Sequence, residues 1–231
     1  MTVGAARIGG DVRLAEPCTL YGGAVLEGPI DAGPGLTVFP GAMLGGAAQH
    51  RRQGPGSLVM GRDCVIRECA TVHRGSVVGT GVTRLGDRVL VMAYAHIGHD
   101  GEVGDDVVLA NGAQVGGHAR IGERAVLSAR CAIHQFVTIG RGAMVAAGAM
   151  VSGDVPPWTT VAGDRARIIG VNAVGLRAAG HEDAAAFRRA LRLALSGASV
   201  PEDLRGSAPV EDLLAFLAAD RQRPICPRGR G

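Results

Sequence analysis

The sequence has no lysine, few aromatic residues and no paired-cysteine motif, and these shortages narrow what the chain can be. Phe, Trp and Tyr make up only 3% of the 231 residues, so large rings cannot build the core. With 47% hydrophobic residues and 37 glycines, we expect a core of small and aliphatic side chains in regular stacks. The net charge of +3, without a basic run interleaved with aromatics before the tail at Arg221, argues against nucleic-acid binding.

Long apolar runs and targeting segments are also missing. Glycine and charged residues interrupt every apolar stretch before it reaches roughly 18 residues, the length that a membrane-spanning helix needs. No charged N-terminal region is followed by an apolar segment, and the five cysteines include no CxxC pair. We therefore expect a protein of the reducing cytoplasm without a membrane span.

An aliphatic residue recurs every six positions over most of the chain. The main series runs from Leu85 to Val151 without exception, and a small or β-branched residue follows nearly every member four positions later. Ordinary strands would give a period of two and helices a period of 3.6, so neither explains the pattern. The same period runs earlier through Ile8, Leu14, Leu20, Leu26, Ala32, Val38, Leu44, Met60, Ile66, Val72 and Val78.

This periodicity predicts an all-β solenoid, a parallel β-helix of hexapeptide repeats. Each hexad forms one flat side of a coil with its first and fifth positions pointing inward, and three sides close a turn of about 18 residues. An insertion at about 45–57 and a one-residue slip between Val78 and Leu85 interrupt the period. Such insertions loop outward, often toward a binding face.

The pattern changes after Pro156-Pro157. We expect the β-helix over residues 1–157 and a C-terminal extension over 158–231. Apolar residues at helical spacing near 183–195 and 210–220 predict a small α-helical region within that extension.

Residues one turn apart lie in one column of a solenoid, which brings several polar groups together. His99 is predicted beneath Gly117 and two coils below Gln135, and Asp100 shares a column with His118. A general base needs a neutral imidazole whose tautomer a carboxylate fixes, and acyl transfer needs a donor aimed at the oxyanion. His99, Asp100 and the Gly117 N–H could supply these roles, although Asp100 could point to the opposite face. Alternatively, these are solvated surface groups without a chemical role.

Six segments carry motifs that occur together in one known family: 66–75 (IRECATVHRG), 95–100 (AHIGHD), 116–118 (GGH), 133–136 (IHQF), 154–157 (DVPP) and 170–176 (GVNAVGL). Over about residues 40–177 the chain resembles the UDP-N-acetylglucosamine O-acyltransferases of lipid A synthesis. The resemblance implies a left-handed parallel β-helix, a homotrimer with active sites between neighbouring subunits, and an acyl donor carried as a thioester on acyl carrier protein. It implies no metal and no cofactor beyond that thioester.

The resemblance also assigns roles to residues. His99 matches the catalytic base, Asp100 its carboxylate partner and Gly117 the backbone donor to the oxyanion. The positions that match the lining of the substrate cleft are His73, His96, His118, His134 and Gln135. A thioester needs no enzyme nucleophile, because the base can activate the acceptor for direct attack.

At the acyl end, the chain departs from the family pattern. The acyl-recognition segment contains Gln49, His50 and Arg52 but lacks the aspartate that reads a 3-hydroxyl in the family. Ala147 stands at the position that limits acyl length, where glycine admits longer chains. A shortened acyl groove is expected.

The nucleotide end departs as well. Asn172 and Arg177 remain from the family's nucleotide-binding residues, whereas Val174, Ala178 and Ala179 occupy positions that are charged in the family. Losing two cations removes charge-assisted contacts to a diphosphate, each commonly worth about 1.5–3 kcal/mol.

We therefore expect an acyltransferase that moves an acyl group from acyl carrier protein or coenzyme A to a hydroxyl or amine of a sugar-type acceptor. The narrower alternative is the UDP-N-acetylglucosamine 3-O-acyltransferase of lipid A synthesis itself. A zinc-dependent hydratase of the γ-carbonic-anhydrase kind, with His96, His99 and His118 as ligands, is a second alternative. A purely structural β-helix that binds no ligand is a third.

Overall fold

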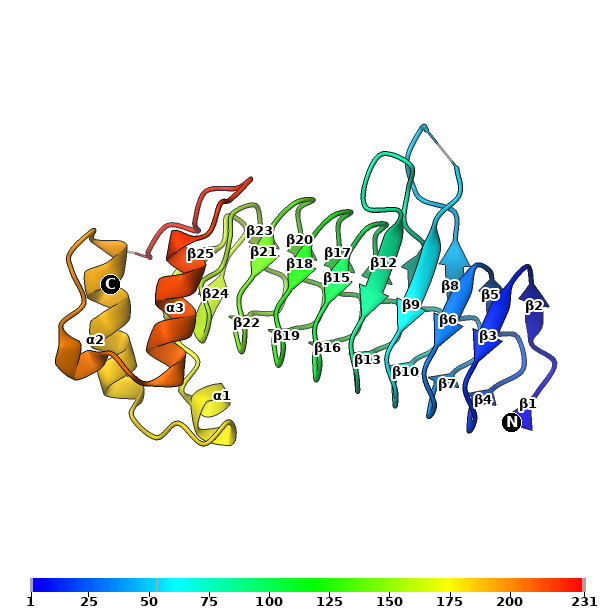
Figure 1. Cartoon of the computed structure of the whole chain (residues 1–231), viewed down its shortest axis with the longest axis horizontal. Helices are drawn as coiled ribbons and strands as arrows, with labels where there is room; N and C mark the ends of the chain where they lie inside the picture. Colours follow the sequence, from blue (N-terminus) through cyan, green and yellow to red (C-terminus); the bar gives the residue numbers. More distant parts are fainter. Residues whose placement is uncertain (1, 53, 230–231) are drawn as a thin grey trace.

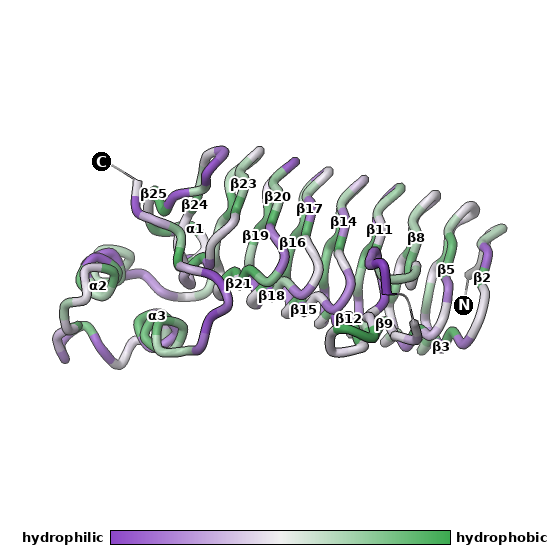
Figure 2. Tube along the Cα trace, turned by 90° about the horizontal axis from the view of Figure 1, so that it is seen from above, coloured by the Kyte–Doolittle hydropathy of each residue, from purple (hydrophilic) through white to green (hydrophobic). Residues whose placement is uncertain are grey.

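Three sheets form the sides of a left-handed β-helix, and helices pack at its C-terminal end (Figure 1). The computed structural model describes residues 2–52 and 54–229. Seen from above, the coils lie in successive parallel rows (Figure 2). The predicted fold class is confirmed.

The first sheet contains, in order of pairing, β1 (Thr2–Val3), β4 (Thr19–Leu20), β7 (Thr37–Val38), β10 (Val65–Ile66), β13 (Leu90–Val91), β16 (Val108–Leu109), β19 (Val126–Leu127), β22 (Met144–Val145), β24 (Thr159–Ala162) and β25 (Arg167–Val171). The second sheet contains β2 (Arg7–Gly9), β5 (Val25–Glu27), β8 (Met43–Gly46), β11 (Thr71–His73), β14 (His96–Ile97), β17 (Gln114–Val115), β20 (Ala132–Ile133) and β23 (Met150–Val151). The third sheet contains β3 (Val12–Leu14), β6 (Ile30–Ala32), β9 (Ser57–Met60), β12 (Val82–Leu85), β15 (Glu102–Val103), β18 (Arg120–Ile121) and β21 (Thr138–Ile139).

The inward hexad positions build the core as predicted. Every member of the series from Leu85 to Val151 is at most 4% exposed, and the small residues at the fifth hexad position are buried with them. Strand pairing follows the same step, since His96 lies beside Gln114 and Gln114 beside Ala132, each 18 residues further along. Ile8 keeps its place in the column beside Leu26 but is 45% exposed, because it belongs to the first coil.

Two coils are longer than the others. Val59 pairs with Asp31, 28 residues before it, and His96 pairs with Thr71, 25 residues before it. Ten and seven extra residues therefore leave these coils, as the 47–56 loop and the 74–81 loop. Where the sequence predicted a slip of one residue, the structure has seven inserted residues, which is one hexad plus one residue. The predicted inward position of Val78 is wrong, since it lies in the second loop and is 39% exposed.

The corners of the solenoid have left-handed backbone at every sixth residue. The non-glycine members of this series from residue 88 onward have φ between 55° and 66°: Arg88, Tyr94, Asp100, Asp106, His118, Arg124, Arg130 and Phe136. Gly112 and Gly142 occupy the same hexad position with φ of 68° and 60°. An L-residue loses roughly 1–2 kcal/mol in this conformation, so the stacked coils must hold it there.

The C-terminal region forms α1 (Ala173–Ala178), α2 (Ala184–Leu195), the 3-10 turn η1 (Glu202–Leu204) and α3 (Ala208–Ala218). The two predicted helices correspond to α2 and α3, whereas α1 was not predicted. Asp183 begins α2 by accepting a hydrogen bond from the Ala186 N–H at 2.7 Å. None of the helices within residues 2–52 and 54–229 is long and apolar enough to cross a membrane.

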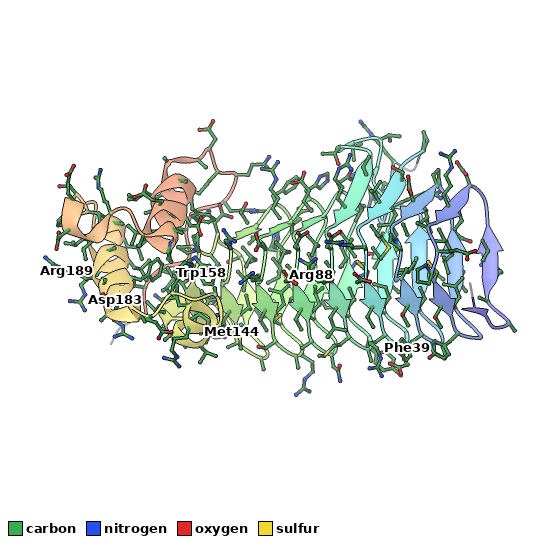
Figure 3. The ribbon with its side chains drawn as sticks, turned by 60° about the horizontal axis from the view of Figure 1, so that its bottom comes forward. Phe39, Arg88, Met144, Trp158, Asp183 and Arg189 are labelled. Carbon is green, nitrogen blue, oxygen red and sulfur yellow. The ribbon has the colours of Figure 1, made fainter. Side chains whose placement is uncertain are left out.

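Trp158 joins the solenoid to the helices. Its side chain lies between the last coil and the helical region (Figure 3), is 1% exposed, and donates from Nε1 to Asp212 Oδ2 of α3 at 3.1 Å. After α3 the chain returns to the last coil, where the Cys226 N–H donates to the Asp154 carbonyl at 2.8 Å. Both contacts tie the C-terminal region to the solenoid.

Candidate active site

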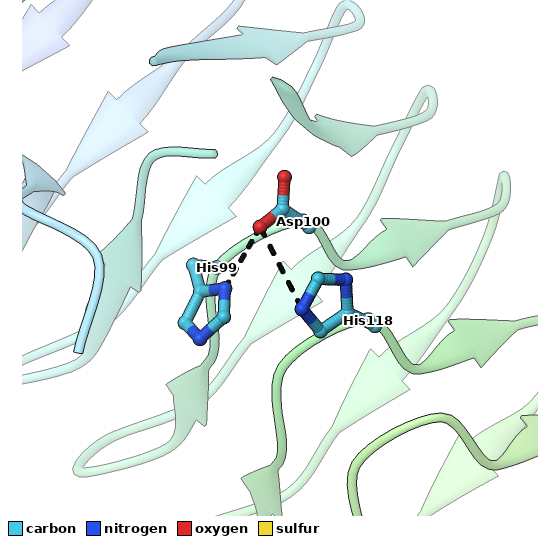
Figure 4. A group of neighbouring side chains, drawn as sticks. All are labelled: His99, Asp100 and His118. Carbon is cyan, nitrogen blue, oxygen red and sulfur yellow. Dashed lines mark hydrogen bonds and ion pairs between the residues drawn. The ribbon is translucent and has the colours of Figure 1, made fainter. Parts of the chain in front are cut away.

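His99, Asp100 and His118 meet at the corner between the second and third sheets (Figure 4). His99 Nδ1 lies 2.8 Å from Asp100 Oδ2, and His118 Nε2 lies 3.9 Å from the same oxygen. The two imidazole rings are 4.9 Å apart and nearly perpendicular, and the His118 ring stacks on Phe136 at 4.5 Å. The predicted column of Asp100 and His118 is confirmed.

The left-handed corner explains why His99 and Asp100 touch. In extended strand, adjacent side chains point to opposite faces, which would have separated the two groups. Asp100 has a φ of 58°, so this alternation is broken at the corner. The sequence did not decide whether His99 and Asp100 touch, and the structure shows a direct hydrogen bond between them.

Gly117 lies directly against the His99 ring, as the 18-residue column predicts. A Cβ atom added to Gly117 would be 2.9 Å from both Nε2 and Cε1 of His99. Within the described part of the chain, the Gly117 N–H has no hydrogen-bond acceptor. Gln135 follows one coil further, where the Phe136 N–H donates to the Gly117 carbonyl. An unused backbone donor thus lies beside a buried imidazole.

The hydrogen bonds around Asp100 set the protonation of this group. Burial alone would raise its pKa, but hydrogen bonds from Ser76, His99 and Gly81 outweigh burial and lower the pKa of Asp100 to about 2. An ionised carboxylate accepts from Nδ1–H of His99, which leaves the lone pair on Nε2 beside Gly117. Burial also lowers the pKa of His118. His99 therefore has the tautomer that a general base needs.

A second pair of histidines, His73 and His96, lines the outer face of the second sheet. Their rings are 5.2 Å apart, and His96 Nδ1 lies 2.8 Å from the Thr71 hydroxyl. His73 Nδ1 donates to the Ala47 carbonyl at 2.5 Å. Burial, together with the charges of His73 and His99, lowers the pKa of His96 to about 4. His96 is neutral at physiological pH and can form hydrogen bonds without adding charge.

The 47–56 loop brings His50 to the catalytic group. The His50 ring faces His99 edge-on with centroids 6.0 Å apart, and its Nδ1 accepts from the Arg52 N–H at 3.1 Å. The side chains of Gln49 and Arg52 are exposed and form no hydrogen bond with His99 or Asp100 in the described structure. Of the predicted acyl-recognition residues Gln49, His50 and Arg52, the structure places only His50 beside the ring of His99.

His134 and Gln135 lie near the C-terminal tail. Arg223 Nη2 lies 2.9 Å from His134 Nδ1, and Arg223 Nε donates to the Gln135 carbonyl at 3.1 Å. Nδ1 of His134 also lies 3.2 Å from the Gln135 carbonyl. A guanidinium only donates and a carbonyl only accepts, so Nδ1 either accepts from Arg223 or donates to this carbonyl. Both side chains are exposed, and neither contacts His99.

The remaining predicted positions lie outside the catalytic group. Asn172 caps α1 by accepting from the Gly175 N–H, and it also donates to the Gly142 carbonyl at 2.9 Å. It lines a cavity of about 650 Å³ that Trp158 and Val174 also line. Ala147 and Arg177 are exposed, and neither lines this cavity.

The three histidines of the zinc alternative, His96, His99 and His118, do not form one group in the described structure. Among the described residues, the ligand-type atoms that lie within 4.8 Å of one another form one group of three, which consists of His99, Asp100 and His118. His96 is outside it, with its Nδ1 engaged by Thr71. Asp100 Oδ2 already accepts from Ser76 and His99, so this group is arranged for hydrogen bonding.

Four residues of the site were not predicted as such. Ser76 and Thr83 hold Asp100, Phe136 stacks on His118, and Arg223 contacts His134. The irregular period around 78–85 was the only sequence signal for the first two. Phe136 stood in a quoted motif, one position after Gln135.

Sequence comparison relates the chain to one enzyme family. The family described as UDP N-acetylglucosamine O-acyltransferase, domain 2, matches residues 154–226. The curated acyl-[acyl-carrier-protein]–UDP-N-acetylglucosamine O-acyltransferase of Thermodesulfovibrio yellowstonii is 38% identical, over 95% of this chain and 89% of that protein. The protein of the same name from Caulobacter vibrioides is 43% identical, over 94% and 87% respectively.

Solved structures agree as well. The UDP-N-acetylglucosamine acyltransferase of Francisella novicida superimposes with a TM-score of 0.89 at 26% identity, covering 98% of this chain and 87% of that one. The enzyme from Campylobacter jejuni gives a TM-score of 0.79 at 29% identity, covering 99% and 98%. This chain therefore belongs to the UDP-N-acetylglucosamine O-acyltransferase family and is an acyltransferase.

Proposed function

We propose that this enzyme transfers an acyl group from acyl carrier protein to a hydroxyl of UDP-N-acetylglucosamine, with His99 as the general base. The observation that carries the proposal is the His99–Asp100 pair beside the unused Gly117 N–H, in a chain whose 38% and 43% identical relatives are named for this reaction. This is the narrower of the two acyltransferase expectations. The broader one, with coenzyme A donors and amine acceptors, is a less specific form of it.

The proposed reaction needs no covalent enzyme intermediate. Nε2 of His99 takes the proton of the acceptor hydroxyl as its oxygen attacks the thioester carbonyl carbon. The new C–O bond gives a tetrahedral oxyanion, which collapses with cleavage of the C–S bond. The leaving thiolate takes the proton back from Nε2, so His99 ends the cycle neutral. Asp100, ionised and buried, stabilises the imidazolium between these two transfers.

Gly117 is the proposed donor to the oxyanion. A backbone N–H held by stacked coils needs no reorganisation during the reaction, which is the property that makes such donors effective. Its glycine also leaves room for the carbonyl next to His99, because any Cβ at this position would lie 2.9 Å from the ring.

The cavity beside Asn172 is the proposed place of the nucleotide, on the strength of the family resemblance. Val174, Ala178 and Ala179 line it without charge. Arg124 also lines it, but its guanidinium is paired with Glu123 at 3.1 Å and Asp106 lines the same cavity, so a diphosphate would gain little electrostatic stabilisation there. We expect weak binding of the nucleotide sugar, with a high KM. The match of Ala147 to the family's acyl-length position adds the expectation of a short acyl chain.

We further propose that the enzyme is a homotrimer that acts in the cytoplasm. The outward positions of the first sheet support the trimer, because an apolar row runs along them: Val65, Leu90, Val108, Val126 and Met144. Light scattering of the purified protein tests the trimer, and fractionation of cells tests the location.

The decisive experiment supplies acyl carrier protein and coenzyme A thioesters of graded length, with UDP-N-acetylglucosamine, free N-acetylglucosamine and a 3-amino analogue as acceptors. Release of free thiol and the product mass are followed. We expect O-acylation of UDP-N-acetylglucosamine from the carrier protein, and a loss of about 10²- to 10⁴-fold in His99→Ala. His181→Gln, at a histidine that packs on Trp158, is the matched control. Equal activity of His99→Ala, or no transfer to any acceptor, contradicts the proposal.

A further inference from the structure

The 74–81 loop closes around the Asp100 carboxylate. Oδ2 accepts the Ser76 hydroxyl at 2.6 Å, and the Ser76 N–H lies 3.1 Å from each oxygen. Oδ1 also accepts from the Gly81 N–H at 2.9 Å and from the Thr80 hydroxyl at 3.3 Å. The side chain of Asp100 is fully buried. Among the described residues, all hydrogen-bond donors to the carboxylate other than His99 thus come from the 74–81 loop.

The loop packs so closely around the carboxylate that two of its positions have no room for a side chain. A Cβ atom at Gly79 would lie 2.4 to 2.6 Å from the carboxyl atoms of Asp100. One at Gly75 would lie 2.1 Å from the backbone of Gly81. Such distances never occur in real structures, so a side chain at either position must displace the loop or the carboxylate.

The 74–81 loop holds Asp100 with neutral donors, namely hydroxyl and amide groups. This distinguishes Asp100 from Asp106, the next aspartate at a corner of the solenoid. Asp106 has the same left-handed backbone, but its carboxylate pairs with the Arg88 guanidinium at 2.7 Å. A cation beside Asp100 would cancel the charge that has to stabilise imidazolium on His99. Hydroxyl and amide donors hold the carboxylate in place and leave its net charge available to the base.

Ser76 and His99 share one oxygen, Oδ2. Two donors that converge on one carboxylate oxygen fix its direction, and a carboxylate fixed in this way holds the imidazole in one plane and one tautomer. We propose that Ser76 is a positioning residue of catalysis, whose hydroxyl, presented by the 74–81 loop, orients Asp100 and thereby His99. This inference rests on the proposed role of His99 as the base.

The alternative is that Ser76 only stabilises the loop. A structural role would lower thermal stability and leave kcat unchanged in the folded fraction. A positioning role lowers kcat at unchanged KM and disappears once the carboxylate is gone. The two are separated by Ser76→Ala, Asp100→Asn and the double variant, with Ser128→Ala as the control hydroxyl on another corner.

We expect Ser76→Ala to lower kcat about 10- to 100-fold with KM values within about twofold of wild type. In the Asp100→Asn background the same change should have no further effect. Gly79→Ala would place a Cβ 2.4 to 2.6 Å from the carboxyl atoms of Asp100 and so disturbs the same contact between the loop and the carboxylate. It should also lower kcat and be non-additive with Asp100→Asn, and it serves where Ser76→Ala does not fold. The proposal is overturned if Ser76→Ala and Gly79→Ala both keep a kcat within twofold of wild type. It is also overturned if Ser76→Ala lowers kcat by the same factor in the Asp100→Asn variant as in wild type.

A second measurement does not depend on turnover. In wild type, ¹⁵N spectra of labelled histidines should show His99 in a single tautomer protonated at Nδ1, and Ser76→Ala should show a mixture. An unchanged tautomer in Ser76→Ala overturns the positioning role, whichever acceptor the enzyme uses. Absence of acyl transfer by wild type with this tautomer present would contradict the proposed function and leave the positioning inference standing.

Discussion

Nδ1 of His99 lies 2.8 Å from Oδ2 of Asp100, although the two residues are adjacent in the chain. The left-handed corner that makes this contact also suits asparagine, so Asp100→Asn should keep the backbone of the corner. An amide N–H facing Nδ1 favours the wrong tautomer, whereas an amide oxygen there gives an imidazolium no charge stabilisation. We expect kcat to fall about 10²- to 10⁴-fold, measured by thiol release from protein shown to be folded by circular dichroism. The melting temperature should fall as well, because the 74–81 loop binds the ionised carboxylate and lowers its pKa to about 2. A loss below threefold would mean that Asp100 does not act on His99.

Gly117→Ala should disable the enzyme without unfolding it. The added methyl group would lie 2.9 Å from Nε2 and Cε1 of His99, so the ring must move away from its position. The other near contact of the methyl group is the His99 carbonyl oxygen at 3.2 Å, so the ring takes most of the displacement. We expect a loss of kcat of about 10²-fold or more and a normal circular dichroism spectrum. Gly9→Ala, where a Cβ would meet nothing within 4 Å and the backbone is not left-handed, is the control for adding a methyl group to the solenoid. Comparable kcat in Gly117→Ala and wild type would contradict the assigned place of the acyl carbonyl.

Thr83→Val tests how the interior of the solenoid holds the corner. The Thr83 side chain is buried, and its hydroxyl accepts the Asp100 N–H at 2.8 Å. Valine keeps the shape but leaves this N–H without an acceptor. We expect the free energy of unfolding to fall by about 1–3 kcal/mol, measured by urea denaturation. Thr138→Val, at an outward position of the same sheet, should change it by no more than about 0.5 kcal/mol, and an equal effect in both would disprove the explanation.

His96 should make stability depend on pH. Its pKa is about 4 in the folded protein and 6.5 in its ordinary state, so between these values the unfolded chain binds more protons. The stabilising contribution of neutral His96 is complete above pH 6.5 and is lost as the pH falls toward 4. We therefore expect the difference in urea midpoint between wild type and His96→Gln to shrink over this range and to stay constant above it. A difference that does not change with pH would show that His96 titrates normally.

Much of the fold was predictable because inward packing repeats. Stacking every sixth residue on the coil below leaves room only for aliphatic or small side chains, and this requirement is visible from Leu85 to Val151. The same arithmetic placed His99 under Gly117 without any structure. His73 and His96 also lie on neighbouring strands, β11 and β14, but the seven residues inserted between them break the 18-residue column, so only the family resemblance placed them together.

The inserted loop and the corner backbone were not predictable in this way. Residues that leave the solenoid no longer obey its period, so nothing in the spacing shows that Ser76 turns back onto Asp100, and Val78 was wrongly placed inside. The left-handed conformation of Asp100 is imposed by the stacked coils rather than by its own preference. The short α1 was missed because a six-residue helix with Gly175 inside it has almost no periodic signal.

The reversed last strand, β25, has a consequence for the behaviour of the protein at high concentration. A stack of parallel coils ends in a row of free backbone groups, which is a template for joining another stack and growing into a fibre. Here β25 runs antiparallel to β24, and its outer side is occupied by the tail, where the Ile168 N–H donates to the Pro227 carbonyl and the Gly229 N–H to the Ile168 carbonyl. At this edge of the first sheet the template is used within the chain, so another stack cannot join there by strand pairing.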